Sequence, residues 1–176
     1  MIYFVRRSFE ADKTKLIHKQ QLKSEINDIL NKEFASLNID YSENSLLYNR
    51  YGKPYIKNHS DVFFNISHCH EMAVCTINSC EAGIDVENIR AYHPRVAKRV
   101  FSDKENEILK NAVNKDETFF RIWTLKESFV KAIGVGISYP MKTCEFLIND
   151  NSFTVNGCDG YNFSQIIVND KFICSL

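Results

Sequence analysis

The sequence lacks the features typical of a membrane protein, a secreted precursor or a nucleic-acid binder. No apolar run reaches the about 20 residues that cross a bilayer, and the apolar stretch after Met1 meets Arg6 and Arg7 too early for a secretory signal. Lysine plus arginine and aspartate plus glutamate balance at 22 each, so no net charge favours a polyanion. We therefore expect a soluble cytoplasmic protein with no nucleic acid and no membrane as partner.

Several common site patterns are also missing. Neither a P-loop nor a G-x-G-x-x-G loop is present, which disfavours the usual nucleotide-binding folds. Six cysteines include no C-x-x-C pair, and the chain is long enough to bury a core without disulfides, so we expect reduced thiols. A zinc site near His68, Cys69 and His70 is disfavoured because the spacing fits no common ligand pattern. Ser67 and His68 would point to opposite faces of a strand, which disfavours a hydrolase pair.

The patterns that are present predict an α+β protein. With 176 residues and 44% hydrophobic content, the chain can bury one core or the cores of two small lobes. Periodicity predicts strands over residues 2–9, 62–66, 72–77 and 83–86, a helix over about 12–36, helices between 94 and 134, and strands over 144–148, 152–155, 162–168 and 171–175. Ser102 and Glu105 form a capping box that starts one helix. This order suggests two α+β lobes of related plan. We expect a single domain over residues 1–176, with lobes at about 1–83 and 84–176.

Two carboxylates share one face of the strand predicted over residues 83–86. Asp85 and Glu87 are two positions apart, which places them about 7 Å apart on the same side. Such a pair could hold Mg²⁺, which prefers oxygen ligands. The alternative is the solvated polar face of an edge strand, and the spacing alone leaves both interpretations open.

A second candidate lies on the last predicted helix, where Trp123, Glu127 and Lys131 recur every four residues along one stripe. A glutamate four residues before a lysine is an ordinary surface ion pair. The same pair could instead supply one metal ligand and one phosphate contact, and the spacing does not decide between these roles.

A third set of side chains can donate hydrogen bonds to phosphate oxygens. Lys53 lies between Gly52 and Pro54, which fix a turn, and Ser67 and His68 end an apolar strand. A lone histidine is more often structural, so this set by itself is weak.

Taken in order, these segments resemble the Sfp-type phosphopantetheinyl transferases, whose pattern runs G-K-P, F-N-I-S-H, G-I-D-x-E, F-x-x-x-E and W-x-x-K-E-x-x-x-K-x-x-G. The matching segments are Gly52 to Pro54, Phe64 to His68, Gly83 to Glu87, Phe101 to Glu105 and Trp123 to Gly134. The resemblance implies two similar α/β subdomains related by a pseudo-twofold axis, with coenzyme A in the cleft between them. The first lobe is shortened relative to the family pattern.

The resemblance also implies roles for individual residues. The metal ligands would be Asp85, Glu87 and Glu127, holding Mg²⁺. The catalytic residues would be Glu127, Lys131 and His68, and either Glu127 or a water on the metal would act as the base. The contacts to coenzyme A would be Lys53, Ser67, His68, Lys126, Lys131 and, in the first lobe, His18 and Lys19. Glu105 matches an acidic position to which no role is assigned.

The implied reaction moves the 4'-phosphopantetheine arm of coenzyme A to a serine hydroxyl of an apo acyl or peptidyl carrier protein and releases adenosine 3',5'-bisphosphate. We expect a Mg²⁺-dependent monomeric enzyme whose carrier docks near residues 88–101, where Arg95 and Arg99 could meet an acidic helix. Because the first lobe is short, a non-catalytic module of the same fold that binds coenzyme A or a carrier protein is the alternative.

Overall fold

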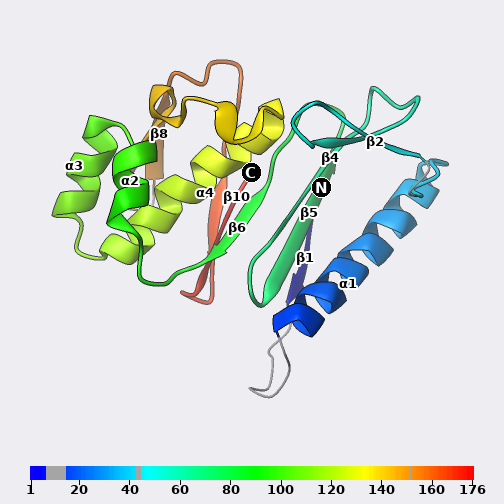
Figure 1. Ribbon diagram of the computed structural model, residues 1–176, viewed down its shortest axis with the longest axis horizontal. Coiled ribbons are helices and arrows are strands. Elements are labelled where there is room, and N and C mark those ends of the chain that lie inside the picture. The colour runs from blue at the N-terminus through cyan, green and yellow to red at the C-terminus, as the bar shows by residue number, and fades with distance from the viewer. Residues whose placement is uncertain (7–14, 43–44, 151) are drawn as a thin grey trace.

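The computed structural model describes residues 1–6, 15–42, 45–150 and 152–176, without the side chains of residues 15–19 and 137. The elements in chain order (Figure 1) are β1 (Ile2–Arg6), α1 (Lys15–Ser36), β2 (Leu46–Tyr48), β3 (Pro54–Ile56), β4 (Phe63–His68), β5 (Met72–Asn78), β6 (Asp85–Asn88), α2 (Pro94–Val100), α3 (Asp103–Asn111), α4 (Lys115–Ile133), β7 (Glu145–Asn149), β8 (Ser152–Asn156), β9 (Gln165–Val168) and β10 (Phe172–Ser175). No helix of this described part is both long and apolar enough to span a membrane.

The two halves of the chain follow the same path. The first sheet has the order β1-β5-β4 and the second has the order β6-β10-β9. In each sheet, the strand that comes last in the sequence lies in the middle. Helices follow the first strand of each sheet, and a short antiparallel hairpin, β2–β3 or β7–β8, precedes the last two strands. This shared topology confirms the prediction of two similar lobes of mixed helix and sheet.

The two sheets face each other, with α1 outside one and α2 to α4 outside the other (Figure 1). Alternate side chains of β5 show this arrangement: Ala73 and Cys75 join the core against α1, whereas Met72 and Val74 join a cluster with Val86 and Phe172 of the second sheet. Such alternation is expected of a strand buried on both faces. The middle of the molecule is therefore a sheet-to-sheet core that both lobes share.

The helices start and end where their capping residues predict. Ser102 and Glu105 form the predicted capping box at the start of α3. Asn114 caps the start of α4 by accepting a hydrogen bond from the Glu117 amide, and α4 ends at Gly134, which has a left-handed φ of 68°. The capping chemistry therefore fixes the ends of α4, the helix that carries Glu127 and Lys131.

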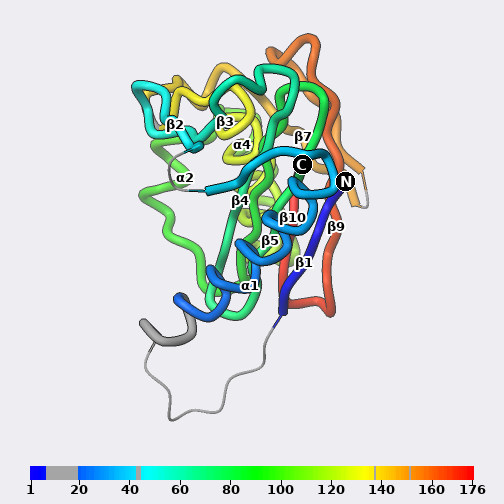
Figure 2. Tube along the Cα trace, turned by 90° about the vertical axis from the view of Figure 1, so that its right-hand side faces the viewer, coloured from blue at the N-terminus to red at the C-terminus, as the bar shows by residue number. Residues whose placement is uncertain are grey.

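The β2–β3 hairpin was not predicted from the sequence. Each strand has three residues, and their pairing places Leu46 opposite Ile56 and Tyr48 opposite Pro54. Strands this short give no readable alternation. In Figure 2 the hairpin lies beside the C-terminal part of α4, and residues 51–54 line the cleft described below.

The expectation that all cysteines are reduced thiols is wrong for one pair. Cys144 and Cys158 form a disulfide, with Cα atoms 5.6 Å apart, across the β7–β8 hairpin. Glu145 pairs with Asn156 at the same end of this hairpin, so antiparallel pairing brings together two cysteines 14 residues apart. A search for closely spaced cysteines cannot find such a pair. The other described cysteines are free.

Candidate active site

Side chains of β4 join the first lobe to the edge of β6. Asn65 Oδ1 accepts a hydrogen bond from the Ile84 amide at 2.9 Å, and Ser67 Oγ accepts one from the Val86 amide at 3.2 Å. Asn65 and Ser67 share one face of β4 because they are two residues apart, and the two amides repeat at the same interval. The motifs F-N-I-S-H and G-I-D-x-E therefore meet as partners at the junction of the lobes.

The start of β6 lies directly against α4. A Cβ at Gly83 would be 2.0 Å from the Ser128 carbonyl oxygen, so only glycine allows this approach. The close contact brings Asp85, two residues further on, to the side of α4 that carries Lys131.

Asp85, Lys131 and Ser67 form the charged centre of the site. Lys131 Nζ donates to Asp85 Oδ1 at 2.6 Å and to Ser67 Oγ at 2.9 Å, while the Ser67 hydroxyl donates to Asp85 Oδ1 at 2.8 Å. Asp85 is 5% exposed. Within the described part of the chain, its Oδ2 is the buried side-chain atom without a hydrogen-bond partner. A bare carboxylate oxygen in such a position is suited to a cation.

Glu127 adds a second acidic group to this centre. Burial, followed by the negative charge of Asp85, raises the pKa of Glu127 to about 7; Lys131 opposes the shift and Glu87 adds to it. A carboxyl whose pKa is raised to near neutral pH by burial and like charges can exchange protons at physiological pH. The site therefore combines a potential proton acceptor with an incompletely compensated negative charge.

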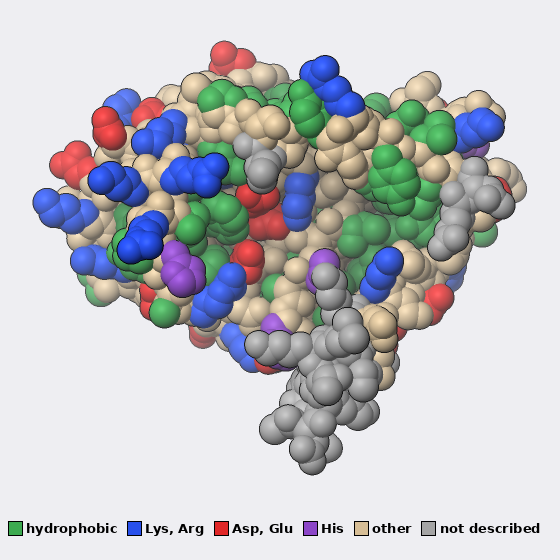
Figure 3. Space-filling view, viewed as in Figure 1, with side chains coloured by type: hydrophobic (Ala, Val, Ile, Leu, Met, Phe, Trp, Pro, Cys, Tyr) green, Lys and Arg blue, Asp and Glu red, His purple; other side chains and the backbone are tan. Residues whose placement is uncertain are grey.

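A cavity of ≈ 280 Å³ lies between the lobes at this centre. It is lined from the first lobe by Tyr51, Gly52, Lys53, Pro54, Asn65 and Ile66, and from the second by Glu127, Val130, Lys131, Gly134 and Gly136. Figure 3 shows acidic side chains beside a basic one near the middle of this face of the molecule. The predicted residues Lys53, Glu127 and Lys131 thus border one interlobe cleft.

The turn of the β2–β3 hairpin is tied to the end of α4. Asn49 Oδ1 accepts from the amides of Tyr51 and Lys53, and Asn49 Nδ2 donates to the Gly134 carbonyl at 2.8 Å. Lys53 Nζ donates to the Ala132 carbonyl, and burial lowers the pKa of this lysine. Sequence reasoning did not single out Asn49, although an asparagine shortly before Gly-Lys-Pro is typical of a side-chain-stabilised turn. Asn49 therefore holds the Lys53 wall of the cleft in place.

A second cavity of ≈ 680 Å³ adjoins Glu127 on its other side. Its lining combines basic side chains, Arg95, Arg99 and Lys142, with Val96, Val100, Trp123, Tyr139, Pro140 and Met141. We call this cavity the basic groove. Figure 3 shows basic side chains gathered over the helical lobe. Glu127 therefore lies at the boundary between the interlobe cleft and the basic groove.

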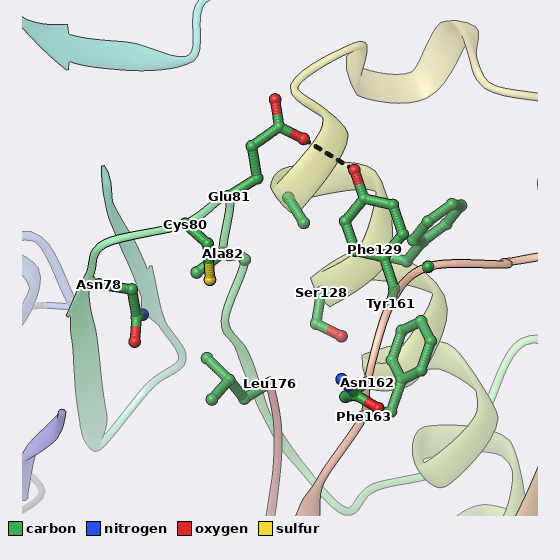
Figure 4. Close-up of a pocket in the computed structure, with 13 residues that line it drawn as sticks. Asn78, Cys80, Glu81, Ala82, Ser128, Phe129, Tyr161, Asn162, Phe163 and Leu176 are labelled. Atoms are coloured by element: carbon green, nitrogen blue, oxygen red, sulfur yellow. Dashed lines mark hydrogen bonds between the residues drawn. The ribbon is translucent and has the colours of Figure 1, made fainter. Parts of the chain in front are cut away.

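A third cavity of ≈ 400 Å³, drawn in Figure 4, has a different position. It is lined by Ser128, Phe129 and Ala132, which belong to a different face of α4 from Glu127 and Lys131. Tyr161 donates to Glu81 at 2.7 Å at its rim. No residue predicted for the site lines this cavity, so it is separate from the interlobe cleft.

The fit of the predicted metal ligands is partial. Asp85 offers a bare oxygen, and the like-charge effect of Asp85 and Glu87 on Glu127 shows that the three carboxylates influence one another. Glu87, however, is engaged with Arg90 at 2.7 Å, and the described residues contain no group of three metal-ligating side chains. A hard cation suits this all-oxygen donor set, but Glu87 would have to exchange Arg90 for the metal.

Lys126 does not lie in the cleft, which corrects its assignment as a coenzyme A contact. Its side chain is 1% exposed, its Nζ is 2.9 Å from Glu105 Oε2, and it also donates to the carbonyls of Met141 and Cys144. Burial lowers the pKa of Lys126 and raises the pKa of Glu105, while their mutual attraction opposes both shifts. Glu105 also accepts from the Phe146 amide. The pair is an internal bond of the second lobe.

Three of the predicted residues remain: His68, His18 and Lys19. His68 is exposed at the end of β4, on the strand face opposite Ser67. The side chains of His18 and Lys19 lie outside the described part of the structure. Their assignment to coenzyme A binding therefore stays a prediction.

Residues 81–175 match the 4'-phosphopantetheinyl transferase superfamily. The chain is 32% identical over 137 residues to the 4'-phosphopantetheinyl transferase gsp of Aneurinibacillus migulanus, covering 76% of this chain and 56% of the relative. It is 39% identical over 106 residues to the 4'-phosphopantetheinyl transferase Sfp of Bacillus subtilis strain 168, covering 58% and 47%. A crystal structure of Thermotoga maritima holo-acyl-carrier-protein synthase aligns with a TM-score of 0.45 and 20% identity over 54% of this chain and 60% of that one.

The match to the family model and the curated relatives confirm the resemblance found in the motifs, and the chain belongs to the 4'-phosphopantetheinyl transferase superfamily. The chain spans about half the length of the curated relatives it matches.

Proposed function

We propose that this protein transfers the 4'-phosphopantetheine arm of coenzyme A to a serine hydroxyl of an apo acyl or peptidyl carrier protein. The observation that carries the proposal is the position of Glu127, which lines both the interlobe cleft and the basic groove. Attack by a serine hydroxyl requires an acceptor for its proton where the two substrates meet. The membership of the chain in the superfamily supports this assignment.

Coenzyme A would occupy the interlobe cleft. Its diphosphate is highly anionic, and Lys53 and Lys131 reach the cleft from opposite lobes. Lys131 Nζ donates to Asp85, to Ser67 and, at 3.2 Å, to the Ile84 carbonyl, so it would contact a phosphate oxygen by exchanging one of these bonds. The two lysines would bind the diphosphate by charge-assisted hydrogen bonds and stabilise the negative charge that develops on transfer.

Glu127 would act as the general base. The serine hydroxyl attacks the β-phosphorus, the bond from that phosphorus to the bridging oxygen breaks, and adenosine 3',5'-bisphosphate leaves with the electron pair. The proton of the hydroxyl would pass to Glu127, the carboxylate that lines both the interlobe cleft and the basic groove. A positioned base of this kind contributes about 10²–10⁴-fold to the rate.

Asp85, Glu87 and Glu127 would hold a Mg²⁺ ion, which when bound supplies charge neutralisation for the diphosphate. Asp85 offers Oδ2 for this purpose, and Glu87 would leave Arg90. Asp85 also orients Lys131 through their ion pair at 2.6 Å.

The carrier protein would dock in the basic groove. Arg95, Arg99 and Lys142 surround the apolar surface of Trp123 there, which complements a helix with acidic side chains around an apolar anchor. Docking at this groove would bring the serine to Glu127.

The direct test is the intact mass of an apo carrier protein after incubation with this protein, coenzyme A and Mg²⁺. We expect a gain of one phosphopantetheine arm per carrier, lost when EDTA is added and when Asp85→Asn replaces the wild type. If several acyl and peptidyl carriers gain no mass while calorimetry shows coenzyme A binding, the protein is a binding module of the same fold and the transfer proposal is wrong.

A further inference from the structure

We propose that Ser67 is a positioning residue that holds Asp85 and Lys131 in their working arrangement, and that it does not contact coenzyme A. This inference rests on the proposed function. It replaces the phosphate-binding role that the family pattern implies for the serine of F-N-I-S-H.

The hydrogen-bonding capacity of the Ser67 hydroxyl is fully used. A serine hydroxyl has one proton to donate and two lone pairs that accept. The proton goes to Asp85 Oδ1 at 2.8 Å, and the lone pairs accept from the Val86 amide at 3.2 Å and from Lys131 Nζ at 2.9 Å. A phosphate oxygen is an acceptor, so it could bind Ser67 only by displacing Asp85. Ser67 is also 5% exposed, which leaves little surface for a ligand.

These three bonds set the orientation of the Asp85 carboxylate. Ser67 and Lys131 both donate to Oδ1, and neither donates to Oδ2, which stays bare in the buried site. The hydrogen bond from the Val86 amide fixes Ser67 itself to β6, the strand that carries Asp85. The Ser67 hydroxyl therefore links the β6 backbone to the side chains of Asp85 and Lys131, and this leaves Oδ2 available for the cation.

Asn65 offers a matched comparison. It lies two residues earlier on the same face of β4, is buried, and joins the same two strands through the Ile84 amide at 2.9 Å. It has no hydrogen bond to Asp85 or Lys131 among those of the described residues. If weakening the junction of the lobes is enough to impair Mg²⁺ binding, replacing either Asn65 or Ser67 should impair it. If positioning of Asp85 and Lys131 matters, only replacing Ser67 should do so.

The experiment compares Ser67→Ala, Ser67→Thr and Asn65→Ala with the wild type in two measurements. The first is the Mg²⁺ concentration that gives half of the maximal rise in melting temperature, measured without substrates. The second is the separation of kcat from KM for coenzyme A in the carrier mass assay. Removing a hydrogen bond to a metal ligand lowers metal affinity or activity by about 10–100-fold.

We expect Ser67→Ala to need about tenfold more Mg²⁺ and to lower kcat by about tenfold or more, with KM for coenzyme A unchanged. Ser67→Thr keeps the hydroxyl and should restore both values. Asn65→Ala should lower the melting temperature without changing the Mg²⁺ midpoint.

The inference is overturned if Ser67→Ala raises KM for coenzyme A with the Mg²⁺ midpoint unchanged, because the hydroxyl then binds substrate. It is also overturned if Asn65→Ala shifts the midpoint as much as Ser67→Ala does. If the wild type transfers the arm and Ser67→Ala matches it in both measurements, the positioning role of Ser67 is wrong while the proposed function stands. A wild type that neither transfers the arm nor responds to Mg²⁺ contradicts the proposed function as well.

Discussion

At the scale of single residues, the site contains more negative charge than its protein partners neutralise. Lys131 compensates one oxygen of Asp85, but Oδ2 has no hydrogen-bond partner among the described residues. Burial and like charges raise the pKa of Glu127 to about 7. Such an arrangement costs stability unless a cation completes it. Perturbed groups of this kind cluster at functional sites.

Glu127→Gln is expected to stabilise the metal-free protein above neutral pH. The folded-state pKa of about 7 lies above the usual glutamate value. Between these two values the folded protein binds more protons than the unfolded chain, so its free energy of unfolding falls as pH rises through that window. A neutral amide avoids this loss, which we place on the order of 1–2 kcal/mol because the side chain is partly exposed. Urea unfolding in EDTA at about pH 4 and about pH 8 measures it.

The matched control is Glu107→Gln, since Glu107 is an exposed glutamate on α3. Its free energy of unfolding should change by less than about 0.5 kcal/mol at both pH values. A Glu127→Gln variant that is no more stable than the wild type at the higher pH contradicts the electrostatic account of the site.

Lys126→Met is expected to destabilise the protein without weakening coenzyme A binding. The change leaves Glu105 as an uncompensated charge in the core and removes two bonds to backbone carbonyls. Breaking a buried pair in this way costs about 3–5 kcal/mol. Chemical denaturation measures the loss, and calorimetry under folding conditions measures coenzyme A affinity.

The double variant Lys126→Met with Glu105→Gln should recover part of the lost stability, because it removes the orphaned charge. A tenfold loss of coenzyme A affinity in a Lys126→Met protein of unchanged stability would show that Lys126 belongs to the cleft after all.

The contrast between Lys126 and Glu127 shows how far residue-level prediction could go. Successive helix residues point about 100° apart, so only one of the two can share the stripe of Trp123 and Lys131. That rule, applied to the sequence, places Glu127 at the cleft and Lys126 off the stripe. The family pattern alone implied both as site residues. The true partners of Lys126 are carbonyls about 15 residues further along the chain, which no local pattern reveals.

At the scale of elements, the cleft depends on contact between the β2–β3 hairpin and the end of α4. Asn49 bonds the Gly134 carbonyl, and Lys53 bonds the carbonyl of Ala132. The last carbonyls of a helix lack partners within the helix. The hairpin donates hydrogen bonds to these carbonyls. Because the same bonds hold the hairpin against α4, it forms a stable wall of the cleft.

Gly134→Ala is expected to cost more stability than Gly160→Ala. Both glycines have positive φ, 68° and 84°, and alanine is strained at either position by about 1 kcal/mol. A Cβ at Gly134 would also lie 2.7 Å from Lys53 Cδ and 3.0 Å from Asn49 Nδ2, whereas one at Gly160 would meet nothing within 4 Å.

Thermal unfolding of both variants measures the difference, and coenzyme A affinity should fall only for Gly134→Ala because its Cβ displaces Lys53. Equal destabilisation of the two variants would contradict the close contact between hairpin and helix.

The sequence predicted most elements but not those made by distant contacts. Helices and strands of five or more residues showed their period, as α1 did through Leu22, Ile26, Leu30 and Phe34, all buried. The three-residue strands of the β2–β3 hairpin and the Cys144–Cys158 pair left no local signal. Hairpin pairing brings such residues together, and pairing is a property of the folded chain.

At the scale of the whole molecule, the two lobes share one core. Met72 and Val74 of the first lobe pack with Ile84, Val86 and Phe172 of the second lobe. Separating the lobes would expose these buried apolar side chains to water. The assignment of residues 1–176 to one domain, with lobes meeting near residue 83, stays a prediction that the shared core supports.

We accordingly expect a single cooperative unfolding transition. Trp123, the single tryptophan of the chain, reports on the second lobe alone, whereas far-ultraviolet circular dichroism reports on both lobes. The two signals should change at the same urea concentration. Transitions with separate midpoints would show that the lobes unfold independently.

The central claim is that Glu127 accepts the proton of a carrier serine at the junction of two substrate sites. Its most direct test is the rate at which an apo carrier protein gains one phosphopantetheine arm, followed by intact mass with wild type and with Glu127→Gln at saturating coenzyme A and Mg²⁺. The account predicts conversion by the wild type and a rate lower by about 10²-fold or more for the folded variant. A Glu127→Gln protein that modifies the carrier as fast as the wild type would contradict it.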